Sequence, residues 1–129
     1  MIVSRPLDGA RVDTLINGKF SIMSDQPAPF GEDSAATPFD IFLAGIASCT
    51  AFYAQRYCRK WKLPHQGITV ELEPIFDEKH LLADVKMKLK VPADFPAEHL
   101  PGLLKNAGNC LVKKTMEAPP AMSLELVID

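Results

Sequence analysis

Residues 37–54 constrain the fold of this chain more than any other segment, because they begin a helix that needs extensive burial. Thr37 suits the N-cap position, Pro38 the first helical position and Asp40 the third, so Thr37-Pro38-Phe39-Asp40 is a variant of the capping box. The charge-free run Ile41–Ala54 follows directly. At 14 residues this run is too short to span a bilayer and is typical of a buried core helix.

The predicted helix extends to about Lys62, because Pro64 and Gly67 follow it. Its first half, residues 41–47, is apolar on every face, which indicates burial on all sides. A chain of 129 residues has few other elements with which to surround such a helix. We therefore expect a second subunit to cover part of it.

Two β-hairpins are predicted on either side of this helix. Asn17-Gly18 favours a type I′ turn that joins residues 11–16 to residues 19–24. Strict alternation of apolar and charged residues predicts a second hairpin over residues 67–91, with its turn near residues 77–80. The pairs expected to face each other are Leu15 with Phe20, Val12 with Met23, Val70 with Met87 and Glu71 with Lys86.

The last third of the chain predicts two helical pieces and a strand. Residues 94–117 are expected to be helical, with a break at Gly108-Asn109 just before Cys110. Residues 123–128 read as a final strand. Because no linker or repeat interrupts the chain, we predict one α+β domain over residues 1–129.

Charge and cysteine usage exclude several classes of function. The net charge of −2 gives no basic footprint for nucleic acid or an anionic membrane. The first residues have no apolar stretch of signal-peptide length, so a cytoplasmic location is expected. The three cysteines, Cys49, Cys58 and Cys110, form no C-x-x-C pair, which argues against a zinc site and a thioredoxin-type motif. The sequence calls for no metal and no cofactor.

Two stretches resemble the osmotically inducible protein C and organic hydroperoxide resistance (OsmC/Ohr) family. The first is residues 36–50, where a loop and a proline lead into a long helix that carries Cys49 about three turns in. The second is residues 108–115, where Cys110 precedes an apolar pair and a threonine. The order of hairpin, long helix, hairpin, helices and strand is also similar to that family, in its OsmC-like branch.

The resemblance implies an OsmC-like fold in an intertwined homodimer, with central helices wrapped by sheets of both chains. It also implies a thiol peroxidase that reduces organic hydroperoxides. In that reading Cys49 is oxidised to a sulfenic acid, Cys110 condenses with it to a disulfide, and a dithiol of the dihydrolipoamide type restores both thiols. Cys58 lies nine residues after Cys49 and so faces another way on the helix, which makes it a bystander.

The resemblance also implies an arginine that activates the reactive cysteine and an acid that holds the arginine. Arg11 at the start of the first hairpin is the expected cation, with Arg5 as the alternative, and a lowered pKa is expected for Cys49. Phe39 stands where the Ohr branch has its glutamate, and the acid is one position later, at Asp40. Asp40 projects roughly opposite Cys49 on a helix, so capping alone is a sufficient role for it.

Two other readings stay open. The first is a non-catalytic OsmC-like protein that senses redox state or binds a small apolar ligand, motivated by the changed glutamate position. The second is a hot-dog thioesterase, whose long helix is also wrapped by a sheet, although its chain order differs and it needs no cysteine pair. Turnover of peroxide with a dithiol separates the peroxidase from the non-catalytic protein.

Overall fold

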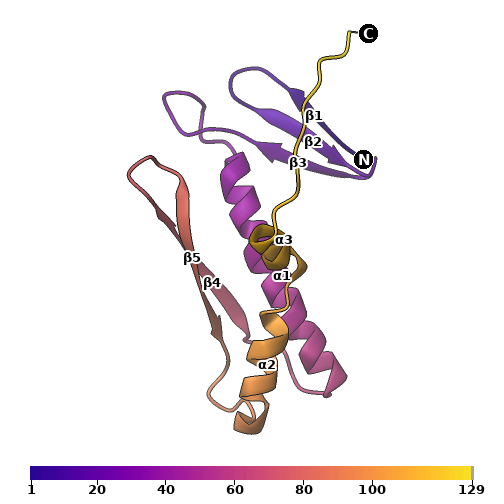
Figure 1. The fold of residues 1–129 in the computed structure, drawn as a ribbon, viewed down its shortest axis with the longest axis vertical. Helices are drawn as coiled ribbons and strands as arrows, with labels where there is room; N and C mark the ends of the chain where they lie inside the picture. Colours follow the sequence, from indigo (N-terminus) through magenta and orange to yellow (C-terminus); the bar gives the residue numbers. More distant parts are fainter. Residues whose placement is uncertain (129) are drawn as a thin grey trace. The chain divides into compact units, whose positions relative to one another are not determined.

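The computed structural model describes residues 1–128 and divides the chain into two compact units (Figure 1). The first unit is Met1–Ala44, and the second begins at Gly45. The long helix α1 (Pro38–Lys60) contributes residues to both. The elements combine β-hairpins with a long helix, which confirms the predicted α+β class; the single domain over residues 1–129 stays a prediction.

The first unit is built on an antiparallel sheet in the order β1-β2-β3. Strand β1 (Ile2–Pro6), which the sequence did not predict, pairs with β2 (Val12–Ile16), and β2 pairs with β3 (Phe20–Ser24). Asn17 and Gly18 both have positive φ, 53° and 66°, and the Lys19 amide donates to the Ile16 carbonyl at 3.0 Å. The predicted turn at Asn17-Gly18 is therefore confirmed.

The predicted register of this first hairpin is wrong by one residue. Leu15 lies opposite Ser21 rather than Phe20, and Val12 lies opposite Ser24 rather than Met23. The cause is Lys19, which adds a third residue to the connection between the paired ends of β2 and β3. A one-residue shift changes which side chains face each other along the entire hairpin.

A buried carboxylate organises the loop that leads from β3 towards α1. Asp25 is 1% exposed and accepts from the backbone amides of Gln26 at 2.8 Å, Ser34 at 3.0 Å and Glu32 at 3.3 Å. The Ser34 hydroxyl donates to the same carboxylate at 2.5 Å. The Ser34 hydroxyl and the Gln26 amide lower the pKa of Asp25 from 3.8 to about 2.

We predict that Asp25→Asn lowers the melting temperature by several degrees at neutral pH, because an amide nitrogen replaces an acceptor that faces donors. The folded-state pKa is depressed, so the carboxylate contributes stability above pH 3.8 and loses it as the pH falls through about 2. The gap between Asp25→Asn and the native protein in thermal melts should therefore close below about pH 2. Asp33→Asn, at an exposed position of the same loop, is the control; an equal effect there would contradict this account.

The helix α1 starts as the sequence predicts. The Asp40 amide donates to Thr37 Oγ1 at 3.1 Å, and the Thr37 amide donates to Asp40 Oδ2 at 3.4 Å, which is the reciprocal pattern of a capping box. The helix ends at Lys60, two residues before the predicted end. Within residues 41–47, Leu43 and Ile46 are buried while Phe42 is exposed, so one chain covers only part of this segment. Cover of the rest by a second subunit stays a prediction.

The second hairpin pairs β4 (Thr69–Phe76) with β5 (Leu82–Lys90) and alternates half-buried with exposed residues, as predicted. The predicted register is wrong by two residues, since Glu71 lies opposite Lys88 and Val70 opposite Leu89. A longer turn causes the shift, with the Asp77 amide donating to the Leu81 carbonyl at 2.8 Å and a bulge at residues 75–76. A shift of two keeps every side chain on its predicted face.

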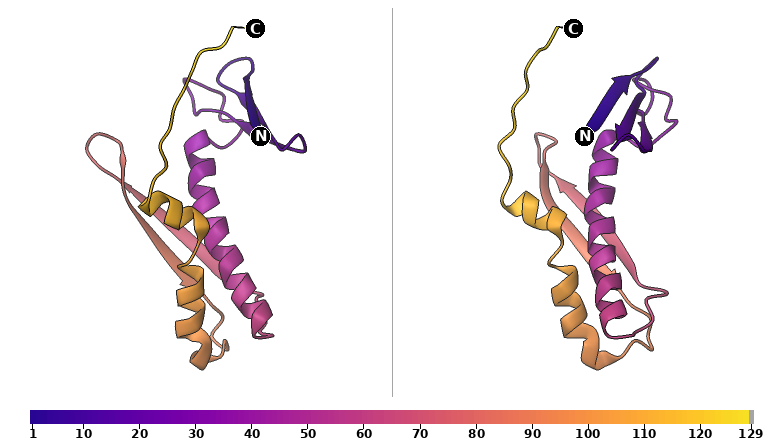
Figure 2. Two further views of the ribbon diagram at one scale, coloured as in Figure 1. Left: turned by 45° about the vertical axis from the view of Figure 1, so that its right-hand side comes forward. Right: turned by 90° about the vertical axis from the view of Figure 1, so that its right-hand side faces the viewer.

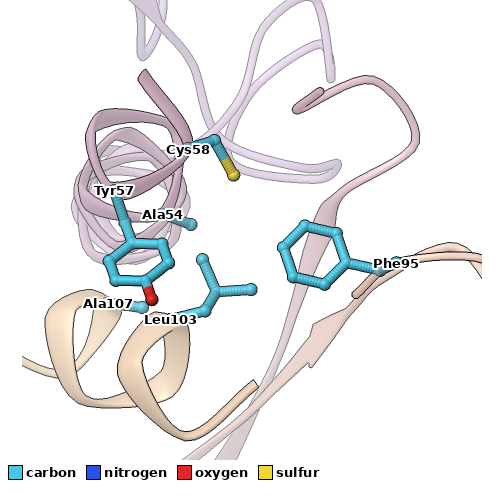
Figure 3. Packing of buried hydrophobic residues seen from close by; sticks show 6 residues of the cluster. All are labelled: Ala54, Tyr57, Cys58, Phe95, Leu103 and Ala107. Carbon is cyan, nitrogen blue, oxygen red and sulfur yellow. The ribbon is translucent and has the colours of Figure 1, made fainter. Parts of the chain in front are cut away.

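The core of the second unit lies between α1 and α2 (Leu100–Ala107) (Figure 3). Ala54, Tyr57 and Cys58 of α1 point towards Leu103 and Ala107 of α2, and Phe95 of the preceding segment closes the cluster. A short 3₁₀ turn, η1 (Ala97–His99), begins α2. The helical structure is interrupted at residues 108–109, as predicted, before the last helix, α3 (Leu111–Glu117).

The predicted strand over residues 123–128 is not formed. These residues have no regular secondary structure, and Leu124, Leu126 and Ile128 are 100%, 91% and 90% exposed. The physical reason is that a strand needs a neighbouring strand for its backbone N–H and C=O groups. Within residues 1–128, no helix is both long and apolar enough to cross a membrane.

Candidate redox site

Two of the predicted site residues meet inside the second unit. Cys49 lies near the middle of α1, and Cys110 is the residue immediately before α3. The two thiols lie close enough for each to shift the pKa of the other, although they are 61 positions apart in the sequence. Figures 1 and 2 show why, since the break after α2 lets α3 start beside the middle of α1.

Cys110 is fully buried and has the larger number of donors around its sulfur. It is the N-cap residue of α3, and its sulfur lies near the first amides of that helix without closing a capping hydrogen bond. Burial raises the pKa of Cys110, but the Cys49 thiol, the Lys113 and Val112 amides and the Thr50 hydroxyl outweigh it, so that the pKa is lowered. Negative charge in the pair is therefore favoured on Cys110.

Cys49 is half-buried and has the opposite tendency. Burial, followed by the contact with Cys110, raises its pKa, while the Val112 and Leu111 amides oppose the rise. This corrects the expectation of a lowered pKa for Cys49. The expectation considered only a cation and the dipole of α1, and left out burial and the neighbouring Cys110 thiol, which raise the pKa.

The third cysteine is separate from this pair. Cys58 is fully buried in the core cluster with Leu103 and Phe95, and burial raises its pKa. A protonated thiol in an apolar core is inert.

The other predicted site residues lie in the first unit. Arg11 is half-buried and its Nε donates to the Asp8 carbonyl at 3.4 Å, while Arg5 is an exposed residue of β1. Asp40 is exposed and forms the capping box with Thr37. Phe39 stacks obliquely with Phe42 at a centroid distance of 5.6 Å. The activating role of Arg11 and the site role of Asp40 stay predictions.

A mostly apolar cavity of about 270 Å³ is lined by residues of α1, β5 and α3 in the second unit. Ile46 lies one helical turn before Cys49, and Lys113 follows Cys110 by three residues; both line this cavity. The remaining lining residues are Leu82, Ala83, Asp84, Val85 and Met87 of β5, and Met116 of α3. The cavity can hold a small apolar molecule, and neither Cys49 nor Cys110 is among its lining residues.

Sequence reasoning missed Thr50 and the amides of residues 111–113. The Thr50 hydroxyl is buried, donates to the Ile46 carbonyl at 3.1 Å and lies 3.6 Å from Met87 Sδ. The predicted break at Gly108-Asn109 could have indicated these amides. A helix that starts after the break has free N–H groups in its first turn, because they have no partner within the helix. Residues 1–128 contain no group of three or more His, Cys, Asp or Glu side chains placed to hold a metal ion.

Comparisons with known proteins give a family from the sequence profile and a fold from solved structures. The sequence profile of the OsmC-like protein family matches residues 31–125, whereas a search of curated protein sequences finds no match. A Psychrobacter arcticus crystal structure, described as an osmotic stress induced and detoxification response protein, has a TM-score of 0.77 at 17% identity and covers 88% of this chain and 85% of its own.

Two further crystal structures share the fold. An OsmC-like protein from Mycoplasma pneumoniae has a TM-score of 0.77 at 11% identity, with 92% of this chain and 87% of its own covered. A Legionella pneumophila protein, described as the organic hydroperoxide resistance protein OsmC, has a TM-score of 0.56 at 16% identity, with 90% and 87% covered. On the profile match over residues 31–125, this chain belongs to the OsmC-like protein family.

Proposed function

We propose that this chain is a thiol-dependent peroxidase that reduces organic hydroperoxides through Cys49 and Cys110. The observation that carries the proposal is that the two thiols lie close enough to shift each other's pKa, in the same unit as a mostly apolar cavity. Membership of the OsmC-like family and the likeness to a protein described as an organic hydroperoxide resistance protein support it. A cytoplasmic location is part of the proposal, because the reducing conditions of the cytoplasm return oxidised cysteines to thiols.

The proposed reaction begins with a proton transfer within the pair. The Cys110 thiolate accepts the Cys49 proton, and the Cys49 thiolate attacks the distal oxygen of the hydroperoxide ROOH. The O–O bond breaks, Cys49 becomes a sulfenic acid, and the alkoxide takes the proton from Cys110 and leaves as ROH. The Cys110 thiolate then attacks the Cys49 sulfur, displaces hydroxide and forms the disulfide.

The second half of the cycle needs a dithiol. A reductant of the dihydrolipoamide type would attack the Cys49–Cys110 disulfide, regenerate both thiols and leave as its own cyclic disulfide. Two electrons thus pass from the dithiol to the hydroperoxide in each turnover.

The cavity lined by α1, β5 and α3 suits the organic part of the substrate. Its volume of about 270 Å³ is near the lower limit of typical ligand pockets, roughly 300 Å³, which favours a small alkyl or aryl group. Ile46, Val85 and Met87 supply apolar surface, and transfer of the organic group from water into it is favourable. As the family resemblance implies, Arg11 remains the proposed cation that activates Cys49, and Asp40 the acid proposed to hold that arginine.

We also propose that the functional form is a homodimer. The motive is the apolar surface that one chain leaves exposed, including Phe42 and Phe52 on α1. Burial of such surface between two copies is favourable in proportion to its area.

The test is to treat the reduced protein with one equivalent of cumene hydroperoxide, block the free thiols and map the products by mass spectrometry. We expect a Cys49–Cys110 disulfide that a dithiol reverses and that disappears in Cys49→Ser and Cys110→Ser. Cys58 should stay free, which makes it an internal control in the same sample. If both Cys49 and Cys110 remain free and slow to react, the peroxidase proposal fails.

The second candidate is the non-catalytic OsmC-like protein that senses redox state or binds a small apolar ligand. The raised pKa of Cys49, caused first by burial, favours it, because a protonated thiol attacks peroxide slowly. The number of turnovers separates the two: a peroxidase consumes many equivalents of hydroperoxide when a dithiol is in excess, whereas a sensor is oxidised once.

A further inference from the structure

Two of the five methionines of the chain line the cavity between α1, β5 and α3. Met87 on β5 is half-buried, and Met116 on α3 is 38% exposed. Met1, Met23 and Met122, which the structure also describes, lie outside this cavity, and Met23 is 41% exposed. Met23 is therefore a natural control for Met116, since solvent reaches both side chains to the same extent.

The Met87 sulfur has a buried hydroxyl beside it. Thr50 on α1 is 6% exposed, and its hydroxyl lies 3.6 Å from Met87 Sδ and 3.1 Å from the Ile46 carbonyl. A hydroxyl has one proton, so it donates to one of these two acceptors at a time. Because a thioether is a weak acceptor, the Ile46 carbonyl receives this proton while Met87 is unmodified.

A sulfoxide at Met87 would reverse this preference, because its oxygen accepts hydrogen bonds far better than a thioether sulfur. The Ile46 carbonyl can release the hydroxyl, since in a regular helix it also accepts from the backbone amide four residues later. A polar atom that is half-buried without a partner costs free energy. Thr50 is thus placed to satisfy the one polar atom that oxidation of Met87 would add.

We propose that Met87 is a modification site, where an organic hydroperoxide bound in the cavity oxidises the thioether to a sulfoxide that the Thr50 hydroxyl then holds. The inference rests on the proposed function in one respect, because it takes an organic hydroperoxide as the molecule that enters the cavity. It needs neither Cys49 nor Cys110. Met116 lines the same cavity and is oxidised as well, but water can reach its sulfoxide.

The oxidation transfers one oxygen atom and two electrons. A lone pair of Sδ attacks the terminal oxygen of ROOH, the S–O bond forms, the O–O bond breaks and an alkoxide leaves. The proton on the transferred oxygen passes to the alkoxide, so the products are methionine sulfoxide and ROH. Sulfur is oxidised by two electrons, and the hydroperoxide is reduced by two. The cavity gains a polar group, which makes it less favourable for the next apolar hydroperoxide.

The simpler explanation is that Met87 only fills space in the second unit, as methionine does in many cores. Oxidation would then follow exposure to solvent: Met116 and Met23 would react at the same rate and Met87 more slowly, whichever hydroperoxide is used. Binding in the cavity predicts a different order for an apolar hydroperoxide alone. Hydrogen peroxide, which has no apolar group, is the reference oxidant.

The experiment uses the full chain with Cys49→Ser and Cys110→Ser, so that no thiol pair consumes the oxidant. One sample is treated with cumene hydroperoxide and the other with hydrogen peroxide. The two doses are adjusted until Met122, which is almost fully exposed, is oxidised to the same extent in both. Differences at the other methionines then report on access and binding rather than on the strength of the oxidant.

Sulfoxide is measured by mass spectrometry after cleavage before aspartate, which places Met87 in peptide 84–93 and Met23 in peptide 13–24. The ratio of Met87 to Met23 oxidation should be about ten-fold higher with cumene hydroperoxide, because its aryl group is transferred from water into the cavity. The ratio of Met116 to Met23 oxidation should rise in the same direction.

The role of Thr50 is tested by the melting temperature before and after this oxidation. Thr50→Val leaves the sulfoxide oxygen without its donor, so oxidation should lower the melting temperature by about 3–5 °C more than in the chain with Thr50. Thr50→Ser, which keeps the hydroxyl, should show no additional loss. Met87→Leu, combined with Thr50→Val, should abolish the additional loss, and this control accounts for oxidation at Met116.

A Met87-to-Met23 ratio that is the same with both oxidants would overturn the inference. So would a Thr50→Val chain whose melting temperature falls on oxidation no further than that of Thr50→Ser. Because the chain under test lacks both thiols of the pair, neither result depends on whether Cys49 and Cys110 form a disulfide. Failure of this inference and failure of the peroxidase proposal are therefore separate results.

Discussion

Replacement of Cys49 by serine is expected to abolish hydroperoxide reduction, with a loss on the order of a thousand-fold or more in turnover. A serine hydroxyl at this position cannot be oxidised to a sulfenic acid and cannot form a disulfide with Cys110. The fold should survive, because the site is half-buried and the exchange of sulfur for oxygen is small. The measurement is consumption of cumene hydroperoxide with dihydrolipoamide in excess, alongside a thermal melt.

Cys58 provides the matched control on the same helix. Cys58→Ser should lower stability by about 1–3 kcal/mol, because it buries a hydroxyl in an apolar core, but turnover per folded molecule should match the native enzyme. Cys58→Ala removes the thiol without burying a hydroxyl and should behave in the same way in the assay. If Cys58→Ala lost as much turnover as Cys49→Ser, Cys58 would be the resolving thiol, and the role given to Cys110 would be wrong.

The sequence predicted the elements of the fold better than their pairing. The cap at Thr37 and Asp40 and the turn at Asn17-Gly18 depend on neighbouring residues, so local chemistry was enough to find them. The registers depended on one additional residue at Lys19 and on a bulge at residues 75–76, for which alternation of apolar and charged residues gives no signal. Strand β1 was missed because its residues, Ile2–Pro6, do not alternate between apolar and polar. In the structure this strand is exposed along its whole length and buries neither face.

The site was predicted in part, and what was missed follows one pattern. The two cysteines were chosen by resemblance, and the structure places them close enough to shift each other's pKa. The direction of the Cys49 pKa was predicted wrongly, because burial of Cys49 and the neighbouring Cys110 thiol were not considered. The groups that act on the pair are amides of residues 111–113 and one hydroxyl, and every residue has an amide whatever its type. Such donors become visible only when the path of the backbone is known.

The C-terminal residues lead to the second large prediction. Leu124, Leu126 and Ile128 alternate with Glu125 and Val127, which is the pattern of a strand with one apolar face. In one chain these three side chains are almost fully exposed. We expect this segment to form its strand only in the proposed homodimer, where a neighbouring strand can satisfy its backbone and its apolar face can be buried.

The double substitution Leu124→Asp and Leu126→Asp is therefore expected to weaken dimerisation about a hundred-fold or more. Burial of each leucine contributes about 1.5–3 kcal/mol, and each 1.4 kcal/mol is a factor of ten in the dissociation constant. Sedimentation velocity at micromolar concentration should show a dimer for the native chain and monomer for the variant. Glu125→Gln, which alters the alternate side of the same strand, is the control and should remain dimeric. A native chain that sediments as a folded monomer would contradict the homodimer itself, whereas an Asp variant as dimeric as the native chain would place the interface elsewhere, on surfaces such as the exposed phenylalanines of α1.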